Sequence, residues 1–117
     1  MSTYASRLMA DTPEIAPAEA ARRSEGVVLL DVREHDEWAA GHAPDALHVP
    51  LGDLRPGAIP AGARVMCICR SGSRSDDATY RLRAAGIDAV NVAGGMLAWA
   101  AAGLPVVCDD GRPGTIA

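Results

Sequence analysis

Residues 64–86 read RVMCICRSGSRSDDATYRLRAAG, and this stretch contains the pattern that decides the fold. It begins with RVMCI (64–68), a short and largely apolar run of the kind that forms a strand buried on both faces of a sheet. A polar segment with one glycine, CRSGSR (69–74), separates this run from a helical pattern over residues 75–86. A strand, a short loop and a helix in this order predict one unit of a parallel α/β fold.

The helix predicted over residues 75–86 has both a start and a stop signal. Ser75 is a favourable N-cap, and Asp76 and Asp77 suit the first turn, where the helix dipole favours negative charge. Gly86 is a typical residue to end a helix. Three apolar side chains share one face of this helix and are expected to pack on the sheet: Ala78, Leu82 and Ala85.

The same alternation of short apolar runs and helical patterns extends to both sides of this unit. Further strands are predicted at VVLLD (27–31), ALHV (46–49) and IDAVNVA (87–93). Helices are predicted over residues 17–26, 34–40 and 96–103, and the polar segment after residue 104 is expected on the surface. The pattern therefore predicts a parallel sheet, and ligands of such sheets bind beyond the carboxyl ends of the strands.

Composition excludes several classes of protein. The chain has 117 residues, 49% hydrophobic and 22% charged, which is typical of one globular domain. Its net charge is −4, so a basic face for nucleic acid is not expected. Three cysteines do not suit the disulfide framework of a secreted protein. With neither an apolar run of about 18 residues nor the apolar core of a signal peptide, we expect a soluble, cytoplasmic protein without membrane contacts.

Cys69 is the strongest candidate for a reactive residue. It is the first residue after a buried strand, where the positive end of the next helix and free backbone N–H groups favour the thiolate. Gly72 allows the backbone to curl into an anion-binding nest, and Arg70 and Arg74 add positive charge. The arrangement suits an activated nucleophile for a small anionic substrate, whereas a core cysteine or a loop that only binds phosphate or sulfate are the alternatives.

Three motifs in order resemble the rhodanese family. CRSGSRS (69–75) is similar to the active-site loop of that family. LLDVREHDEWAAGHAPDALHVPL (29–51) resembles its upstream signature, with Asp-x-Arg, Gly-His and a closing Pro, and VAGGMLAW (92–99) resembles its downstream Gly-Gly…Trp element. The resemblance covers a domain over roughly residues 14–107, which leaves an N-terminal extension (1–13) and a C-terminal tail (108–117).

The resemblance implies a three-layer α/β sandwich with a central five-stranded parallel sheet flanked by helices. It also implies a thiosulfate sulfurtransferase in which Cys69 carries the transferred sulfur as a persulfide. The substrate-binding loop would consist of Arg70, Ser71, Gly72, Ser73 and Arg74. The implied donor is thiosulfate or a persulfide, and the implied acceptor is cyanide, a small thiol or a thioredoxin-like protein. No metal and no organic cofactor is expected to take part.

Two other functions remain open at this stage. Some rhodanese-like domains act as regulatory or anion-binding modules without catalysis, but inactive copies commonly lose the cysteine that is present here as Cys69. Related phosphatases and arsenate reductases use C-x-x-x-x-x-R, a wider loop that can hold a tetrahedral phosphate. Here only four residues separate Cys69 from Arg74, which favours a sulfur atom over a phosphoryl group.

Asp31 and Arg33 follow the strand over residues 27–31 and are expected at the same edge of the sheet as Cys69. They could support and orient the loop from behind it. A partly buried ion pair that fastens the strand to the next helix is the preferred interpretation. His42, in the Gly-His signature, is interpreted as a hydrogen-bonding corner residue and not as a catalyst.

The two remaining cysteines have less specific settings. Cys67 lies on the same strand face as Cys69 and is interpreted as a core thiol, because adjacent positions on one face give poor disulfide geometry. Cys108 is either a spare surface thiol or, if the tail folds over the loop, a resolving cysteine. Trp38 and Trp99 are expected to anchor their helices in the core. Asp45 stands where the family commonly has glycine.

Overall fold

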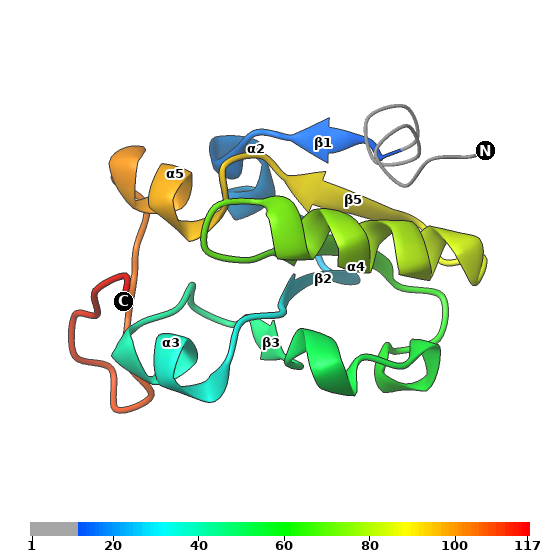
Figure 1. Cartoon of the computed structure of the whole chain (residues 1–117). Helices are drawn as coiled ribbons and strands as arrows, with labels where there is room; N and C mark the ends of the chain where they lie inside the picture. Colours follow the sequence, from blue (N-terminus) through cyan, green and yellow to red (C-terminus); the bar gives the residue numbers. More distant parts are fainter. Residues whose placement is uncertain (1–11) are drawn as a thin grey trace.

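The computed structural model describes residues 12–117 and is built around a five-stranded parallel sheet (Figure 1). Residues 1–11 of the expected N-terminal extension lie outside the described residues. The strands are β1 (Glu14–Ile15), β2 (Val27–Asp31), β3 (Leu47–His48), β4 (Arg64–Ile68) and β5 (Ala89–Val92), in the spatial order β1-β5-β4-β2-β3. The predicted strands are therefore confirmed, and β1 completes the sheet at one edge.

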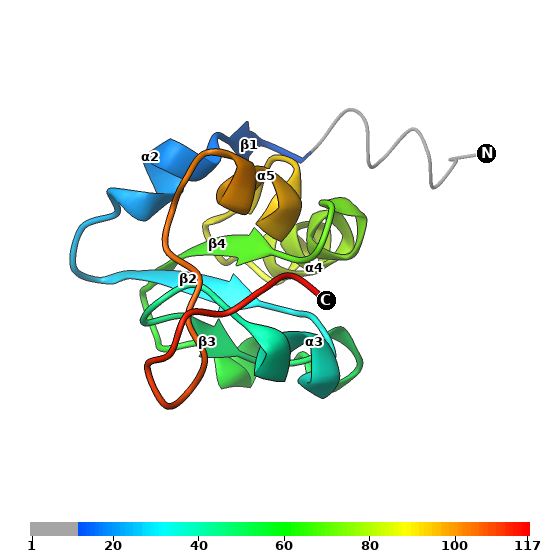
Figure 2. The ribbon, with the colours of Figure 1, turned by 90° about the vertical axis from the view of Figure 1, so that its left-hand side faces the viewer.

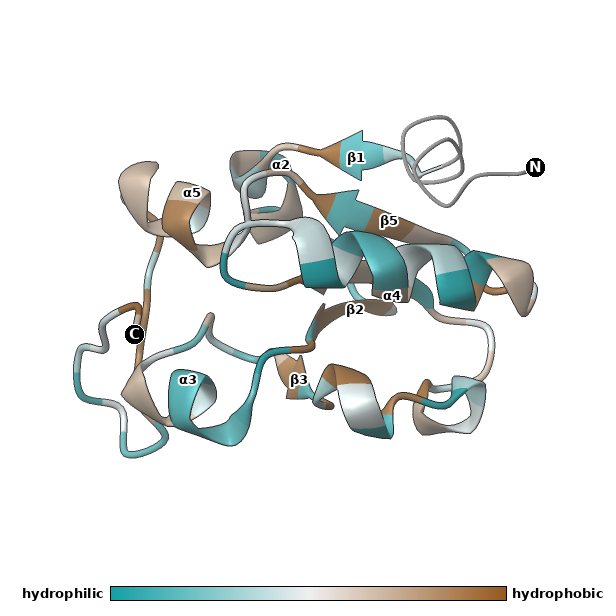
Figure 3. Ribbon diagram, in the orientation of Figure 1, coloured by the Kyte–Doolittle hydropathy of each residue, from teal (hydrophilic) through white to brown (hydrophobic). Residues whose placement is uncertain are grey.

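β4 occupies the centre of the sheet, between β5 and β2. In the register, Cys67 lies opposite Leu30 of β2 and opposite Asn91 of β5. Residues 65–68 are buried, and Figure 3 shows the neighbouring strand β5 in apolar colours except for one hydrophilic band. Because β2 and β4 pair in parallel through Asp31 and Ile68, both strands end at the same edge, as the sequence predicted.

Helices cover both faces of this sheet. They are α2 (Pro17–Ala21), α3 (His35–Ala40), α4 (Ser73–Ala84) and α5 (Gly95–Ala101), with 3₁₀ turns η1 (Leu51–Asp53) and η2 (Pro56–Ala58). α2 and α5 pack with each other over one face through Ala20 and Trp99, while α4 packs on the other face through Ala78 and Leu82. The expected three-layer α/β sandwich is thus present. None of the helices within residues 12–117 has the length and apolar character to cross a membrane.

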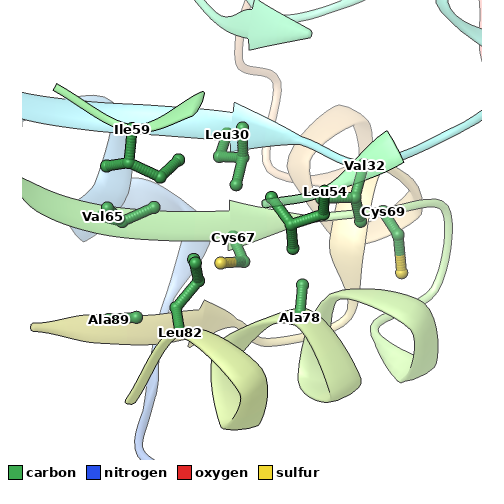
Figure 4. Packing of buried hydrophobic residues seen from close by; sticks show 10 residues of the cluster. All are labelled: Leu30, Val32, Leu54, Ile59, Val65, Cys67, Cys69, Ala78, Leu82 and Ala89. Carbon is green, nitrogen blue, oxygen red and sulfur yellow. The ribbon is translucent and has the colours of Figure 1, made fainter. Parts of the chain in front are cut away.

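The side chains of β4 alternate between two apolar clusters, as the pleat of a strand requires. Met66 and Ile68 point to the cluster under α2 and α5. Val65 and Cys67 point to the cluster under α4, where Leu82 covers them (Figure 4). Cys67 is fully buried in this cluster, so the expectation of a core thiol is confirmed by its position.

The segment after α5 runs along the body of the domain and returns to α3 (Figure 2). Most of it is exposed, as expected, but it is held by defined hydrogen bonds. Val107 exchanges two backbone hydrogen bonds of 2.9 Å with His42, and the Thr115 N–H donates to the Ala40 carbonyl over 2.9 Å. A Cβ at Gly41 would lie 2.6 Å from the Thr115 carbonyl oxygen, so this close approach requires glycine there.

The expectation that Trp38 is a core anchor is wrong. α3 lies beside the edge strand β3, and its Trp38 is only half-buried, stacked between the rings of His42 (centroids 3.6 Å apart) and His48 (4.6 Å). His42 nevertheless has the expected corner role, because its ring nitrogens lie 3.1 Å from the Ala43 carbonyl and 2.9 Å from an Asp109 carboxylate oxygen. Trp99, in contrast, is buried, and its N–H donates to the Pro105 carbonyl.

Asp45 adopts a backbone conformation that glycine would adopt more easily. Its φ is +63°, and within residues 12–117 it is the one non-glycine residue with positive φ. L-residues other than glycine pay a steric cost in this region, and aspartate is among those that tolerate it best. Asp45 therefore occupies a backbone conformation typical of glycine, the residue that the resemblance led us to expect at this turn.

Candidate active site

Cys69 leaves the sheet from its central strand and is fixed to the start of α5. Its backbone carbonyl accepts a hydrogen bond of 2.7 Å from the Met96 N–H, and the Arg70 carbonyl accepts one of 3.0 Å from Leu97. The Cys69 residue is only 1% exposed. The loop that follows β4 is therefore attached to a second element before α4 begins, which gives the thiol a defined position.

Two hydrogen-bond donors point at the Cys69 sulfur. The Gly72 backbone N–H donates to Sγ over 3.1 Å, and the Ser75 hydroxyl donates to Sγ over 3.2 Å. Gly72 has φ +113°, a left-handed conformation that lets the loop curl back toward its own cysteine. The predicted curl of the loop around Cys69 is therefore present. Donors that point at a sulfur atom stabilise negative charge on it.

Ser75 has a different role from the predicted N-cap. α4 begins at Ser73, two residues earlier than expected, with Gly72 as its N-cap residue. Ser75 therefore lies inside the first turn, fully buried, with its hydroxyl on the Cys69 sulfur. The helix also ends earlier than predicted, at Ala84. Ala85, which the sequence placed on the buried face, is exposed at the C-cap, and Thr79 lies on the buried face instead. The polar residue nearest the helix start looked like a cap, and no local signal revealed that its hydroxyl faces the thiol.

Arg74 does not contribute a free charge to the loop. Its guanidinium forms a bidentate ion pair with Glu37 of α3, with N–O distances of 2.7 and 2.8 Å. The hydrogen bonds from Arg74 are the main reason that the pKa of Glu37 falls from 4.5 to about 2, and the same contact raises the pKa of Arg74 above its usual value. The sequence predicted that Arg74 adds positive charge around Cys69; in the structure this charge is paired with Glu37, and Arg74 joins α4 to α3.

Arg70, Ser71 and Ser73 lie exposed at the outer side of the loop. The Arg70 Nε–H donates to the carbonyl oxygen of Ala117 over 2.9 Å, which brings the C-terminal segment to the loop over residues 69–74. The structure thus brings Cys69, Gly72 and Ser75 together around one sulfur. Arg70 is the exposed cation of the predicted loop.

Asp31 and Arg33 form a fully buried ion pair, with both side chains 0% exposed. Arg33 donates to Asp31 through Nε (3.0 Å) and Nη2 (2.8 Å), and its Nη2 also donates to the Gly41 carbonyl over 2.8 Å. Its Nη1 reaches the Glu37 carbonyl over 3.3 Å. The ion pair therefore joins the end of β2 to α3, which is the role that the sequence favoured. It also sets the position of Glu37, whose carboxylate holds Arg74.

The three cysteines differ in their surroundings. Burial raises the pKa of the Cys67 thiol to about 12, which keeps it protonated near neutral pH. The Cys108 sulfur lies 3.6 Å from the Ala40 carbonyl and 3.8 Å from the Pro113 carbonyl, neither of which belongs to the loop over residues 69–74. Only Cys69 has donors of the loop directed at its sulfur.

The Glu37–Arg74 ion pair predicts a pH-dependent stability. Because the pKa of Glu37 is about 2 in the fold and 4.5 without its partners, its stabilising effect is complete above about pH 4.5 and is lost as the pH falls toward 2. Glu37→Gln should lower the free energy of unfolding by about 1–2 kcal/mol at pH 7, a value reduced for solvent screening, and by almost nothing near pH 2. Urea unfolding of both proteins across this range measures the difference. A constant difference from pH 7 to pH 2 would contradict the role of the ion pair.

The fold and the site together define a class of protein: a parallel α/β domain with a buried cysteine after its central strand, in a curled loop that donates hydrogen bonds to the thiol. A family model, the rhodanese-like domain, matches residues 16–102 of the chain. The chain therefore belongs to the rhodanese-like domain family.

Individual relatives agree with this assignment. The chain is 42% identical over 91 residues to a sulfurtransferase of Allochromatium vinosum, an alignment that covers 75% of this chain and 85% of that protein. It is 39% identical over 95 residues to the uncharacterized protein slr1261 of Synechocystis, covering 79% of this chain. The aligned part is about half, 53%, of the Synechocystis protein. The crystal structure of a rhodanese-related protein from Thermoplasma volcanium superposes with a TM-score of 0.78 at 28% identity, over 83% of this chain and 99% of that one.

Proposed function

We propose that this chain is a rhodanese-type sulfurtransferase in which Cys69 accepts a sulfane sulfur as a persulfide and passes it to a nucleophile. The observation that carries the proposal is the Cys69 sulfur itself, which accepts hydrogen bonds from Gly72 (3.1 Å) and Ser75 (3.2 Å). Such donors favour a charged sulfur nucleophile. The family membership and the sulfurtransferase of Allochromatium vinosum support the same chemistry.

The first half-reaction loads the enzyme. The Cys69 thiolate attacks the outer sulfur of thiosulfate, a new S–S bond forms, and the original S–S bond breaks with its electron pair leaving on sulfite. A persulfide donor reacts in the same way and releases a thiolate. The exposed Arg70 guanidinium at the loop would attract the anionic end of the donor. No proton has to be removed from the thiolate in this step, so the reaction requires no separate general base.

The second half-reaction removes the transferred sulfur from the enzyme. Cyanide or an acceptor thiolate attacks the outer sulfur of the Cys69 persulfide, and the Cys69 thiolate leaves with the electron pair. Cyanide yields thiocyanate, and a thiolate acceptor, from a small thiol or a thioredoxin-like protein, yields a persulfide. The Gly72 N–H and the Ser75 O–H stabilise the sulfur that carries charge at the start and at the end of the cycle.

Intact-mass spectrometry after mixing the purified protein with thiosulfate tests this function. We expect an adduct of one sulfur atom that fragmentation of the peptide assigns to Cys69, and that cyanide removes with formation of thiocyanate. Protein pre-treated with iodoacetamide serves as the control and should take up no sulfur. The absence of an adduct from both thiosulfate and glutathione persulfide would overturn the proposal in favour of a non-catalytic regulatory module. Release of phosphate from an aryl phosphate would favour the phosphatase alternative.

A further inference from the structure

Asn91 is a buried amide in an otherwise apolar strand, directly beside the active-site loop. It lies in β5 between Val90 and Val92 and is 1% exposed. Its Nδ2 donates to the Gly72 carbonyl over 3.1 Å and to the Glu14 carboxylate over 3.2 Å. Its Oδ1 is buried and finds no hydrogen-bond partner among residues 12–117. A polar side chain with a buried, unsatisfied oxygen in the sheet calls for an explanation.

The orientation of the Asn91 amide is determined by its two neighbours. Both the Gly72 carbonyl and the Glu14 carboxylate are acceptors, so the nitrogen with its two N–H groups has to face them. The reversed amide would place Oδ1 against two other oxygens. Both N–H groups of the Asn91 amide are therefore hydrogen-bonded, and the Oδ1 atom is the one without a partner among residues 12–117.

The fold does not need this amide to satisfy the groups that it contacts. The Gly72 carbonyl also accepts a hydrogen bond of 3.1 Å from the Asp76 N–H. Glu14 is an exposed residue that water can solvate. An apolar side chain of similar volume at position 91 would leave neither of them unpaired, and it would remove the unsatisfied oxygen. Stability of the fold alone therefore favours an apolar residue at this position.

What the amide adds is a fixed position for Gly72. Gly72 has φ +113° and ψ −14°, and its N–H is one of the two donors on the Cys69 sulfur. Glycine has no side chain to limit its rotation, so its orientation depends on what holds its backbone. Asn91 holds the Gly72 carbonyl from the sheet side, while the Asp76 N–H holds it from α4.

We propose that Asn91 is a positioning residue of the active site, which anchors Gly72 to β5 so that the Gly72 N–H stays directed at the Cys69 sulfur. Asn91 acts through Gly72 and does not contact the sulfur. Glu14, on the neighbouring strand β1, holds the second N–H of the same amide and so fixes it in turn. The consequence for sulfur transfer rests on the proposed function, whereas the effect on Cys69 reactivity does not.

Asn91→Leu separates positioning from stability, because it should leave the melting temperature unchanged or raise it while Cys69 becomes less reactive. We expect iodoacetamide at pH 7, without any sulfur donor, to alkylate Cys69 about fivefold more slowly in Asn91→Leu, since one charge-stabilising donor is no longer held in place. Mass spectrometry of the Cys69 peptide measures the rate.

Val90→Ala is the matched control. Val90 precedes Asn91 in β5 but packs in the cluster on the opposite face of the sheet. This variant should lower the melting temperature and alkylate at the wild-type rate. If Asn91→Leu fails to fold, Asn91→Met gives the second comparison, because its flexible thioether side chain adapts to the space and carries no N–H donor.

Equal alkylation rates in folded Asn91→Leu or Asn91→Met and in the wild type would overturn the positioning role, and so would an equal loss of rate in Val90→Ala. Failure of the proposed sulfur transfer has a different signature: the wild type would form no persulfide, but the alkylation comparison would stand. A normal persulfide yield with equal alkylation rates would remove only the role of Asn91.

Discussion

Cys69→Ser is expected to reduce the turnover of thiosulfate and cyanide to thiocyanate by at least about a thousandfold, because an alcohol oxygen cannot form the persulfide that both half-reactions share. The substitution keeps the size of the side chain. It also keeps an acceptor for the Gly72 N–H and the Ser75 hydroxyl, so the loop should remain folded. A thiocyanate assay on protein with an unchanged circular dichroism spectrum measures the loss.

Cys67→Ala should behave in the opposite way. Cys67 is completely buried, and its pKa of about 12 keeps it a neutral thiol at the pH of the assay. Its replacement leaves a small cavity under α4, so we expect a loss of about 1 kcal/mol in stability and a turnover within about twofold of the wild type. A variant that loses turnover while it stays folded would assign the persulfide, or an essential relay, to Cys67.

Cys108→Ser completes the comparison. The Cys108 sulfur faces the carbonyls of Ala40 and Pro113, so we expect turnover to be retained in this variant. Loss of turnover in Cys108→Ser, together with a disulfide between Cys108 and Cys69 in the wild type after donor treatment, would instead assign Cys108 the role of a resolving cysteine.

The parts of the fold that the sequence predicts well are those with local causes. A strand buried on both faces is largely apolar, so RVMCI (64–68) and VVLLD (27–31) can be recognised without any knowledge of their partners. The place of Cys69 follows from the same pattern, because the residue after a central parallel strand has to emerge at the carboxyl edge. The curl of the loop at Gly72 could be predicted because glycine alone adopts a backbone conformation such as φ +113° without strain.

The parts that the sequence did not predict depend on contacts between distant segments. Arg74 looked like a free cation because its partner Glu37 lies on another helix, and only the tertiary fold brings the two side chains together. Ser75 looked like a helix cap because serine is frequent there, but Gly72 already starts the helix. The link between Asn91 and Gly72 crosses from β5 to the loop. A polar residue inside IDAVNVA (87–93) was the single local sign of it.

Gly95 is the residue whose replacement should damage the fold and the site together. It has φ +60°, and a Cβ there would lie 2.6 Å from the Arg70 carbonyl carbon and oxygen and even closer to the Cys69 carbonyl oxygen. These atoms belong to the same loop backbone that accepts hydrogen bonds from Met96 and Leu97 at the start of α5. The contact is with backbone and not with the end of a flexible side chain, so the loop or α5 would have to move as a whole.

Gly95→Ala should therefore lower the free energy of unfolding by about 3 kcal/mol or more, with a melting temperature roughly 10 °C lower, and should reduce persulfide formation on Cys69 in the protein that remains folded. Gly103→Ala is the matched control: Gly103 has φ +76°, but nothing lies within 4 Å of its Cβ position. It shares the backbone penalty without the clash, so its cost should be about 1 kcal/mol with normal persulfide formation. Thermal unfolding and intact mass measure both variants. Equal melting temperatures would mean that left-handed strain alone, and not the approach of α5 to the Cys69 loop, explains the need for glycine at position 95.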